Sequence, residues 1–163
     1  MDNKLPTTVN KFAQKGRLKK INGSIINPES SGLRFILSFV GLGGKYDGDN
    51  KIFADRWLKT NSEYKSWYVN RQNFKTGAFI EVPVASDIWI IELATFDKEG
   101  ALDTKALASG LKKVSERAKY EHASVHMASE LVEKTEGLDS LIQTLFIDNG
   151  VNVSIYAQEL ISK

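Results

Sequence analysis

The chain has 163 residues, of which 42% are apolar and 26% charged, proportions that fit one globular domain and exclude an intrinsically disordered chain. It contains no cysteine, which excludes disulfides, thiolate zinc sites and a cysteine nucleophile and favours a reducing compartment. No apolar run approaches the roughly 20 residues that span a bilayer, and the start of the sequence lacks the apolar stretch of a signal peptide. We therefore expect a cytoplasmic protein without a membrane partner.

The net charge is +2, but the cations are concentrated at the start of the sequence. The first 22 residues carry six lysines and arginines and one aspartate, so the remainder is mildly acidic. We divide the chain into a basic N-terminal arm, residues 1–17, and one domain, residues 18–163. The arm could steer the protein toward a phosphate-bearing or acidic partner, or it could be a solvated leader. Nucleic-acid binding is a further alternative, although no aromatic residues are interleaved with these lysines.

The first half of the sequence predicts a buried strand, a loop and a helical region. Residues 33–40 are almost continuously apolar, as in a strand that is buried on both faces. They run into the cluster Gly41-Leu42-Gly43-Gly44, which predicts a loop. Between residues 50 and 70, aromatic residues recur at helical spacing and predict one or two helices with most rings in the core.

The second half predicts further strands that alternate with helices. Residues 78–84 and 87–94 are strand candidates, and Pro83 suits an edge or strand-end position in the first. The later elements are a helix through Leu107–Ala118 capped by Asp103 or Thr104, a strand at Ala123–Met127, a helix from Leu138 to Asn149-Gly150 and a strand at Val151–Ile155.

This alternation predicts a mixed, largely parallel sheet that is covered on both faces. In such sheets, ligands bind in the crevice beyond the carboxyl ends of the strands. The loops that follow Val40, Ala94, Met127 and Ile155 are therefore the predicted site.

Several segments resemble, in the same order, a subgroup of macro domains found in bacteria and their viruses. Leu107–Val114 is similar to the penultimate helix of that family, Ala123–Met127 to the strand that delivers its phosphate loop, and Leu141–Tyr156 to its last helix and strand. Arg56–Tyr68 resembles the first long helix, and Ile21-Asn22-Gly23 the opening strand.

The resemblance covers about residues 18–156 and implies an α/β fold, a macro-domain-like three-layer α/β/α sandwich around a sheet of about six strands. Macro domains bind ADP-ribose, but this sequence departs from their usual ligand contacts. Gly23 is followed by Ser24, where the family usually has an aspartate that reads the adenine amino group. The family also has an asparagine near the distal ribose. In this sequence the corresponding position falls near Gly41, so that contact is lost.

Two glycine-rich loops of the family are also altered. The first corresponds to Gly43–Asn50, where Asp47 and Asp49 would repel a pyrophosphate. The second, whose amides cradle the phosphates in the family, corresponds to a loop over Ala128–Gly137 with one glycine and three glutamates. Only Lys134 offers compensation there.

Other site chemistries find little support in the sequence. Gly41–Gly44 matches neither a Walker A loop nor a dinucleotide fingerprint, and the spacing after Asp47 does not continue as a calcium loop. His122 and His126 straddle a helix-to-strand boundary, and we expect His126 in the core or the crevice. We assign no catalytic residue, no metal and no cofactor. The candidate ligand-binding residues of the crevice are Ser24, Gly41, Gly43, Gly44, Tyr46, Asp47, Met127, Ser129, Lys134 and Tyr156, the last as a stacking platform.

We interpret the chain as a non-catalytic macro-domain-like recognition protein that binds a protein partner or a nucleotide variant. The implied context is ADP-ribosylation or nucleotide-based conflict, for example antagonism of an ADP-ribosylating toxin or of an immune signal, which is fold-level analogy. One alternative is a functional ADP-ribose-binding protein or ADP-ribosyl hydrolase with rearranged contacts, in which Asp47 or Asp49 supplies a general base. A second alternative is a nucleic-acid accessory protein that uses the basic arm.

Overall fold

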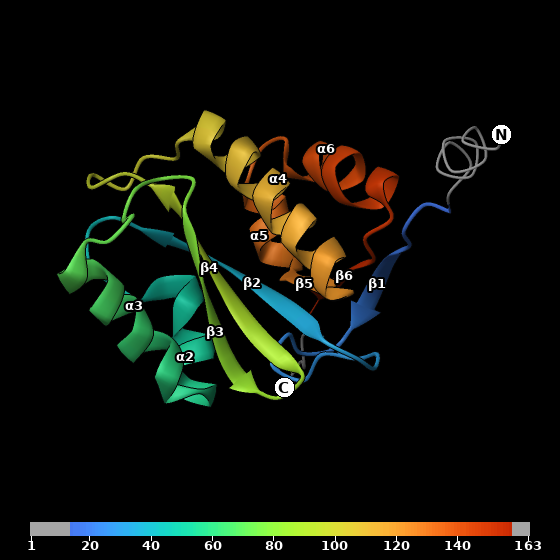
Figure 1. Ribbon diagram of the computed structural model, residues 1–163, viewed down its shortest axis with the longest axis horizontal. Helices are drawn as coiled ribbons and strands as arrows, with labels where there is room; N and C mark the ends of the chain where they lie inside the picture. Colours follow the sequence, from blue (N-terminus) through green and yellow to red (C-terminus); the bar gives the residue numbers. More distant parts are fainter. Residues whose placement is uncertain (1–13, 158–163) are drawn as a thin grey trace, which may run out of the picture.

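The computed structural model describes residues 14–157, which contain one six-stranded sheet (Figure 1). The strand order is β1-β6-β5-β2-β4-β3, and every neighbouring pair is parallel except β3 with β4. The predicted mixed, largely parallel sheet is therefore confirmed, and Pro83 does lie in an edge strand. The strands are β1 (Leu18–Asn22), β2 (Arg34–Gly41), β3 (Phe79–Ala85), β4 (Ile88–Phe96), β5 (Ser124–Ala128) and β6 (Val153–Ala157).

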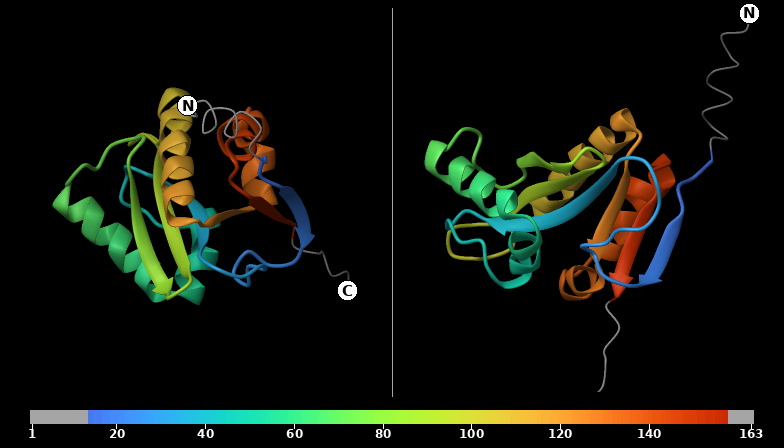
Figure 2. Two further views of the ribbon diagram at one scale, coloured as in Figure 1. Left: turned by 45° about the vertical axis from the view of Figure 1, so that its right-hand side comes forward. Right: turned by 90° about the horizontal axis from the view of Figure 1, so that it is seen from below.

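Helices cover both faces of this sheet, as the three-layer prediction requires (Figures 1 and 2). One face carries α2 (Lys51–Arg56) and α3 (Leu58–Asn70), which follow a 3-10 turn at Gly48–Asn50. The other face carries α4 (Thr104–Glu121), α5 (Ser129–Lys134) and α6 (Leu138–Leu141), and the last continues through a π-helical turn, Ile142–Phe146, and a 3-10 turn, Ile147–Asn149.

Alternation along β2 shows why most of its residues are apolar. Phe35 and Leu37 belong to the core cluster beneath α4, whereas Ile36 and Val40 belong to the clusters on the side of α2 and α3. Successive side chains of a strand point to opposite faces, so a strand between two helical layers needs apolar residues at every position.

The boundaries of the helices follow local chemistry. The Asp103 side chain accepts a hydrogen bond from the Ala106 amide at 3.0 Å and caps α4, which confirms the predicted cap. Trp57 adopts an extended conformation and divides the predicted aromatic region into α2 and α3. The aromatic face is largely core, because Tyr64 and Trp67 of α3 are buried.

The stretch that follows β5 differs from the expectation of a loop. Residues Ser129–Lys134 form the short helix α5, because Leu131 is buried against the core beneath α4 and draws this segment into helical geometry. Gly137, with a φ of +83°, then turns the chain into α6. The expectation of an extended, glutamate-rich loop was therefore wrong.

The predicted arm is partly visible, since residues 14–17 are described and residues 1–13 lie outside the described residues. The Gly16 amide donates to the Ile147 carbonyl at 2.8 Å, and the Arg17 amide donates to the Asn152 side chain at 2.9 Å. The end of the arm is thus attached to the domain, and the boundary at residue 17 stays a prediction. No helix within residues 14–157 is long and apolar enough to cross a membrane.

Candidate functional site

A crevice with a volume of about 640 Å³ lies at the carboxyl ends of the parallel strands. Its walls come from the segments that follow β1, β2, β4 and β5, and Tyr156 of β6 completes them. The sequence predicted a site at this edge of the sheet. The space between the segments after β2 and β5 is open.

Half of the ten candidate residues line this crevice. They are Gly41, Gly43, Asp47, Lys134 and Tyr156. The remaining five lie beside the crevice or beneath its surface: Ser24, Gly44, Tyr46, Met127 and Ser129.

Strand and turn geometry explain why two of these side chains miss the crevice. Met127 is fully buried beneath α4, because it lies on the opposite face of β5 from His126. Tyr46 is buried among Val40, Tyr64 and their neighbours, because the chain turns inward after Gly44, whose φ is +88°. Their expected place in the crevice is therefore corrected.

Three other candidates support the walls. Ser24 is a turn residue whose hydroxyl accepts the Ile26 amide at 3.3 Å. Gly44 lies so close to the Tyr68 ring that a Cβ would be 2.7 Å from Cζ. Ser129 begins α5, and its neighbours Ala128 and Glu130 line the crevice in its place.

The loop after β2 is held by a buried tyrosine from α3. The Tyr64 hydroxyl donates to the Gly41 carbonyl at 2.5 Å and accepts the Gly44 amide at 3.0 Å. Lys65 adds a bond from Nζ to the Gly44 carbonyl at 3.0 Å. These bonds fix the wall of the crevice before any ligand is bound.

Asn50 is a lining residue whose role the sequence did not reveal. Its side chain is largely buried, and Nδ2 donates to Ser38 Oγ at 2.7 Å and to the Phe39 carbonyl at 2.8 Å. Sequence reasoning considered Asn50 only as the end of the first glycine-rich loop and in a rejected calcium loop. The signal that could have found it is a lone amide just before a helix, because buried polar groups need partners from a neighbouring strand.

The turn after β4 lies where the sequence predicted the site, but none of its residues was among the candidates, and several apolar lining residues were missed as well. The turn Asp97–Gly100 lines the crevice, and its position after a central strand was the available signal. The apolar lining comes from Ile25, Leu37, Phe39, Ile52, Phe53, Phe96 and Leu131.

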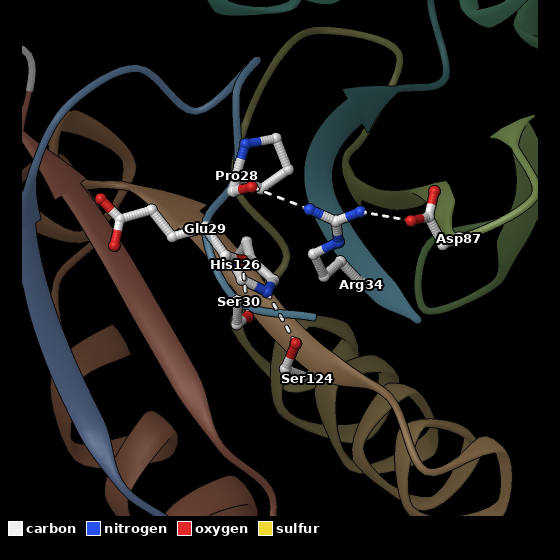
Figure 3. Close-up of polar contacts among 7 residues, drawn as sticks. All are labelled: Pro28, Glu29, Ser30, Arg34, Asp87, Ser124 and His126. Carbon is white, nitrogen blue, oxygen red and sulfur yellow. Dashed lines mark hydrogen bonds and ion pairs between the residues drawn. The ribbon is translucent and has the colours of Figure 1, made fainter. Parts of the chain in front are cut away.

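The wall formed by the β1–β2 segment, across from the loop after β2, depends on a chain of hydrogen bonds through Tyr156. Its hydroxyl accepts the Glu29 amide at 2.9 Å and lies 2.8 Å from His126 Nδ1, with which it shares a hydrogen bond. The other ring nitrogen, His126 Nε2, forms a hydrogen bond with Ser124 Oγ at 2.7 Å. Arg34 binds the same β1–β2 segment through the Pro28 carbonyl at 2.8 Å (Figure 3).

Burial, with help from the charges of Arg34 and Lys19, lowers the pKa of His126 to about 4. The ring is thus neutral at physiological pH and serves as a structural link, consistent with the expectation of a core histidine. Tyr156 itself is only 2% exposed, so it offers little surface for stacking on a ligand.

The lining of the crevice carries more negative than positive charge. Three lysines, Lys45, Lys98 and Lys134, are opposed by five carboxylates from Asp47, Asp49, Asp97, Glu99 and Glu130. Lys134 of α5 forms an ion pair with Asp49, which joins α5 to the segment before α2. The cation expected to compensate for a lost phosphate loop is therefore engaged by a carboxylate.

Glu92 is buried in β4 beneath the crevice, beside Ser38 of β2. Burial raises the pKa of its carboxyl to about 8, and the nearby Tyr46 hydroxyl offsets this only in part. Within the described part of the chain, neither carboxyl oxygen has a hydrogen-bond partner. Glu92 does not line the crevice, so it influences the site only through the packing of its floor.

The arrangement offers binding surfaces more readily than reactive groups. Among residues 14–157, no three histidine, aspartate or glutamate side chains are placed to hold a metal ion. Glu130 occupies the first turn of α5, so it places a negative charge beside the amides at that end. The crevice is therefore preformed, partly apolar and unfavourable to a second concentration of negative charge.

Comparisons with known proteins extend the description of the fold. No protein-family model matches the sequence, and no curated protein matches it. The macrodomain protein from Streptomyces coelicolor has a TM-score of 0.80 at 21% identity, with 88% of this chain and 100% of that chain covered.

Two further structures have the same architecture at lower identity. The macrodomain of Mycobacterium tuberculosis DarG has a TM-score of 0.66 at 19% identity, with 88% of this chain and 99% of that chain covered. Thermosipho africanus DarTG, solved in complex with ADP-ribose, has a TM-score of 0.68 at 15% identity, with 90% of this chain and 43% of that chain covered. The chain therefore has the macro-domain fold, as its sequence predicted.

Proposed function

We propose that this chain is a non-catalytic recognition protein whose crevice binds a protein side chain or a nucleotide variant with less negative charge than ADP-ribose. One observation carries the proposal: an open crevice of about 640 Å³ retains its walls, while its lining has two carboxylates in excess. Like charges at close range repel, and the effect is larger where apolar walls exclude water.

The hydrogen bonds that hold the walls of the crevice agree with a retained binding role. Tyr64 and Asn50 hold the loop and the floor through buried hydrogen bonds. Several residues of the lining, among them Asp47, Asp49 and Glu130, carry the same negative charge as phosphate. Such a combination suits a rigid crevice with altered ligand preference.

Hydrolysis of an ADP-ribosyl bond finds less support. It requires a positioned water and donors directed at the departing phosphate. Asp49 is engaged by Lys134, and Glu130 stands at the start of α5, where free amides would be needed. This combination supports the proposed non-catalytic role.

The alternative is a functional ADP-ribose-binding protein with rearranged contacts. It is favoured by the preformed Gly41–Gly44 loop and by the fold shared with a protein solved in complex with ADP-ribose. In either case the proposed context is ADP-ribosylation or nucleotide-based conflict, including antagonism of a toxin or an immune signal.

Thermal unfolding with ADP-ribose and adenosine in parallel tests the proposal. A ligand present at a hundredfold over its dissociation constant stabilises a protein by about 2.7 kcal/mol. We expect no such stabilisation by millimolar ADP-ribose in the unaltered chain. Strong stabilisation at micromolar ADP-ribose would instead establish the alternative, and Gly43→Glu should then abolish it, since Gly43 lines the crevice.

A pair of charge variants makes the test specific. Asp49→Asn with Glu130→Gln removes two charges from the lining, and we expect ADP-ribose affinity to rise roughly tenfold or more at low salt. The matched control, Glu133→Gln with Asp139→Asn, removes two charges from exposed positions outside the crevice. Equal effects of both pairs would contradict a local cause.

A further inference from the structure

A second hollow, with a volume of about 870 Å³, lies at the opposite end of the sheet from the crevice. We call it the basic pocket. It is bounded by the segment that enters β1, the amino ends of β5 and β6, the end of α4, and Ser30 and Ser31 between β1 and β2. The proposed function of the crevice makes no use of it.

The floor of the basic pocket is a polar part of the sheet. Lys19 of β1 is the register partner of Ser154 of β6, and Ser124 of β5 also lines the pocket. Parallel strands in such folds are usually apolar on both faces. Here α2 and α3 lie over the other half of this face, and the segment between β1 and β2 lies beside the polar part (Figure 2).

Cations and hydroxyls dominate the lining. The positively charged side chains are those of Lys15, Arg17, Lys19 and Lys119, and all four residues are exposed. No aspartate or glutamate is among the described residues that line the pocket. Asp148 lies 3.3 Å from Lys15, so three cations face the pocket without a carboxylate partner within residues 14–157. Four serines add hydroxyl groups: Ser30, Ser31, Ser124 and Ser154.

This chemistry matches phosphate groups, and its layout suits a polymer. The cations are exposed and come from two separate segments, the entry to β1 and the end of α4, so each can neutralise a different phosphate. Exposed lysines contribute little to a single anion, whereas counterion release sums over the phosphates of a nucleic acid. No phenylalanine, tyrosine or tryptophan lines the pocket, and His122 is the one ring in its lining, so bases have little surface for stacking there.

We propose that the basic pocket binds the phosphodiester backbone of a nucleic acid without reading its sequence. The Lys19–Ser154 floor supplies charge and hydroxyls from the sheet, and Lys119 supplies charge from the rim. The pocket and the crevice lie at opposite ends of the strands, so both can be occupied at once. This inference does not depend on the ligand of the crevice.

Fluorescence anisotropy with the full chain and a labelled 20-nucleotide DNA strand of mixed sequence tests the proposal. We compare the unaltered chain with the triple variant Arg17→Gln, Lys19→Gln, Lys119→Gln. Loss of three phosphate contacts should weaken binding at least tenfold at low salt and reduce the slope of log K against log salt by about 2. The result should be similar for a second strand of unrelated sequence.

A matched control distinguishes an effect of the basic pocket on DNA binding from an effect of the protein's net charge. Lys59→Gln, Lys75→Gln, Lys112→Gln removes the same charge from exposed lysines outside both hollows, and DNA binding should remain near that of the unaltered chain. Equal loss in both triple variants, or no binding by the unaltered chain, would overturn the proposal.

Two competitors distinguish other anions. Polyglutamate of equal charge should displace DNA poorly, and inorganic pyrophosphate should require a large excess over DNA phosphate. Effective displacement by polyglutamate would indicate an acidic-protein site, and effective displacement by pyrophosphate would indicate a small-phosphate site. Either result would overturn the assignment to nucleic acid.

Discussion

Two buried ionisable residues, Glu92 of β4 and His126 of β5, lie on the same face of the sheet, one on each side of β2. Both side chains are fully buried. His126 has hydrogen-bond partners at both ring nitrogens, in Tyr156 and Ser124, whereas neither oxygen of Glu92 has one within the described residues. Burial keeps both neutral by moving their pKa values in opposite directions.

The two residues differ in what they do for the structure. His126 helps to hold a wall of the crevice, whereas Glu92 is buried without ordering its neighbours. His126 holds Tyr156, which in turn holds the β1–β2 segment through the Glu29 amide. Glu92 makes no bond that orders its surroundings, so its removal should cost little structure. A buried polar group without a partner lowers stability, whereas a satisfied one adds specificity.

Glu92→Gln should give the largest effect, and its sign depends on pH. The pKa of Glu92 is about 8 in the folded chain against 4.5 for a free glutamate side chain, so its contribution is complete below pH 4.5 and is lost as pH rises toward 8. Between pH 5 and pH 8 the unaltered chain should lose about 3 kcal/mol from this group, whereas the variant should not. Urea unfolding at several pH values measures the difference. Parallel pH profiles for the two proteins would show that Glu92 is hydrated in the folded state.

His126→Gln should change the acid side of the profile. The folded pKa of about 4 lies below the value of 6.5 for a free histidine side chain, so this group's contribution is complete above pH 6.5 and is lost as pH falls toward 4. The unaltered chain should lose about 1.4 kcal/mol per pH unit from this group in that window. The variant should be less stable at pH 7 because Tyr156 loses its partner, yet its profile should be flatter. An unchanged acid slope in urea unfolding would count against a buried neutral ring.

The sheet and its layers could be predicted from the sequence because periodicity and burial act locally. The apolar residues of β2 and the cap at Asp103 leave a direct signature in the order of residues. The position of the crevice followed too, since the carboxyl ends of parallel strands meet at one edge. Residues such as Asp47, which follow those strands directly, were placed correctly.

The details of the site could not be predicted, because they depend on contacts between distant parts of the chain. Tyr64 holds Gly44 across 20 positions, and Asn50 is fixed by the strand that contains Ser38. Tyr46 follows glycines that suggest an open loop, but its ring is buried by helix α3. Burial of this kind becomes visible only when the layers are assembled.

Gly16→Ala tests how closely the segment that enters β1 packs beside the basic pocket. A Cβ on Gly16 would be 2.2 Å from the Val151 carbonyl oxygen, so the backbone of the segment that carries Lys15 and Arg17 has to move. Overpacking against backbone costs about 1–3 kcal/mol, and we expect a loss in this range. Gly43→Ala is the matched control, because its Cβ would have only an ordinary contact with the Lys98 carbonyl. Thermal unfolding of both variants measures the difference, and equal stability would contradict the close approach.

Tyr64→Phe tests whether the tyrosine hydroxyl holds the loop after β2 at the crevice, as His126 holds Tyr156. The ring remains buried, but the Gly44 amide and the Gly41 carbonyl lose their common partner. Leaving such groups without a partner costs about 1–2 kcal/mol, a smaller loss than removal of the ring would cause. Hydrogen exchange at residues 42–45 should accelerate, while exchange in β6 should not change, because Tyr156 is held independently through His126. Unchanged exchange at Gly44 would show that the loop is held by its own turns, and the rigid wall proposed for the crevice would then have a different origin.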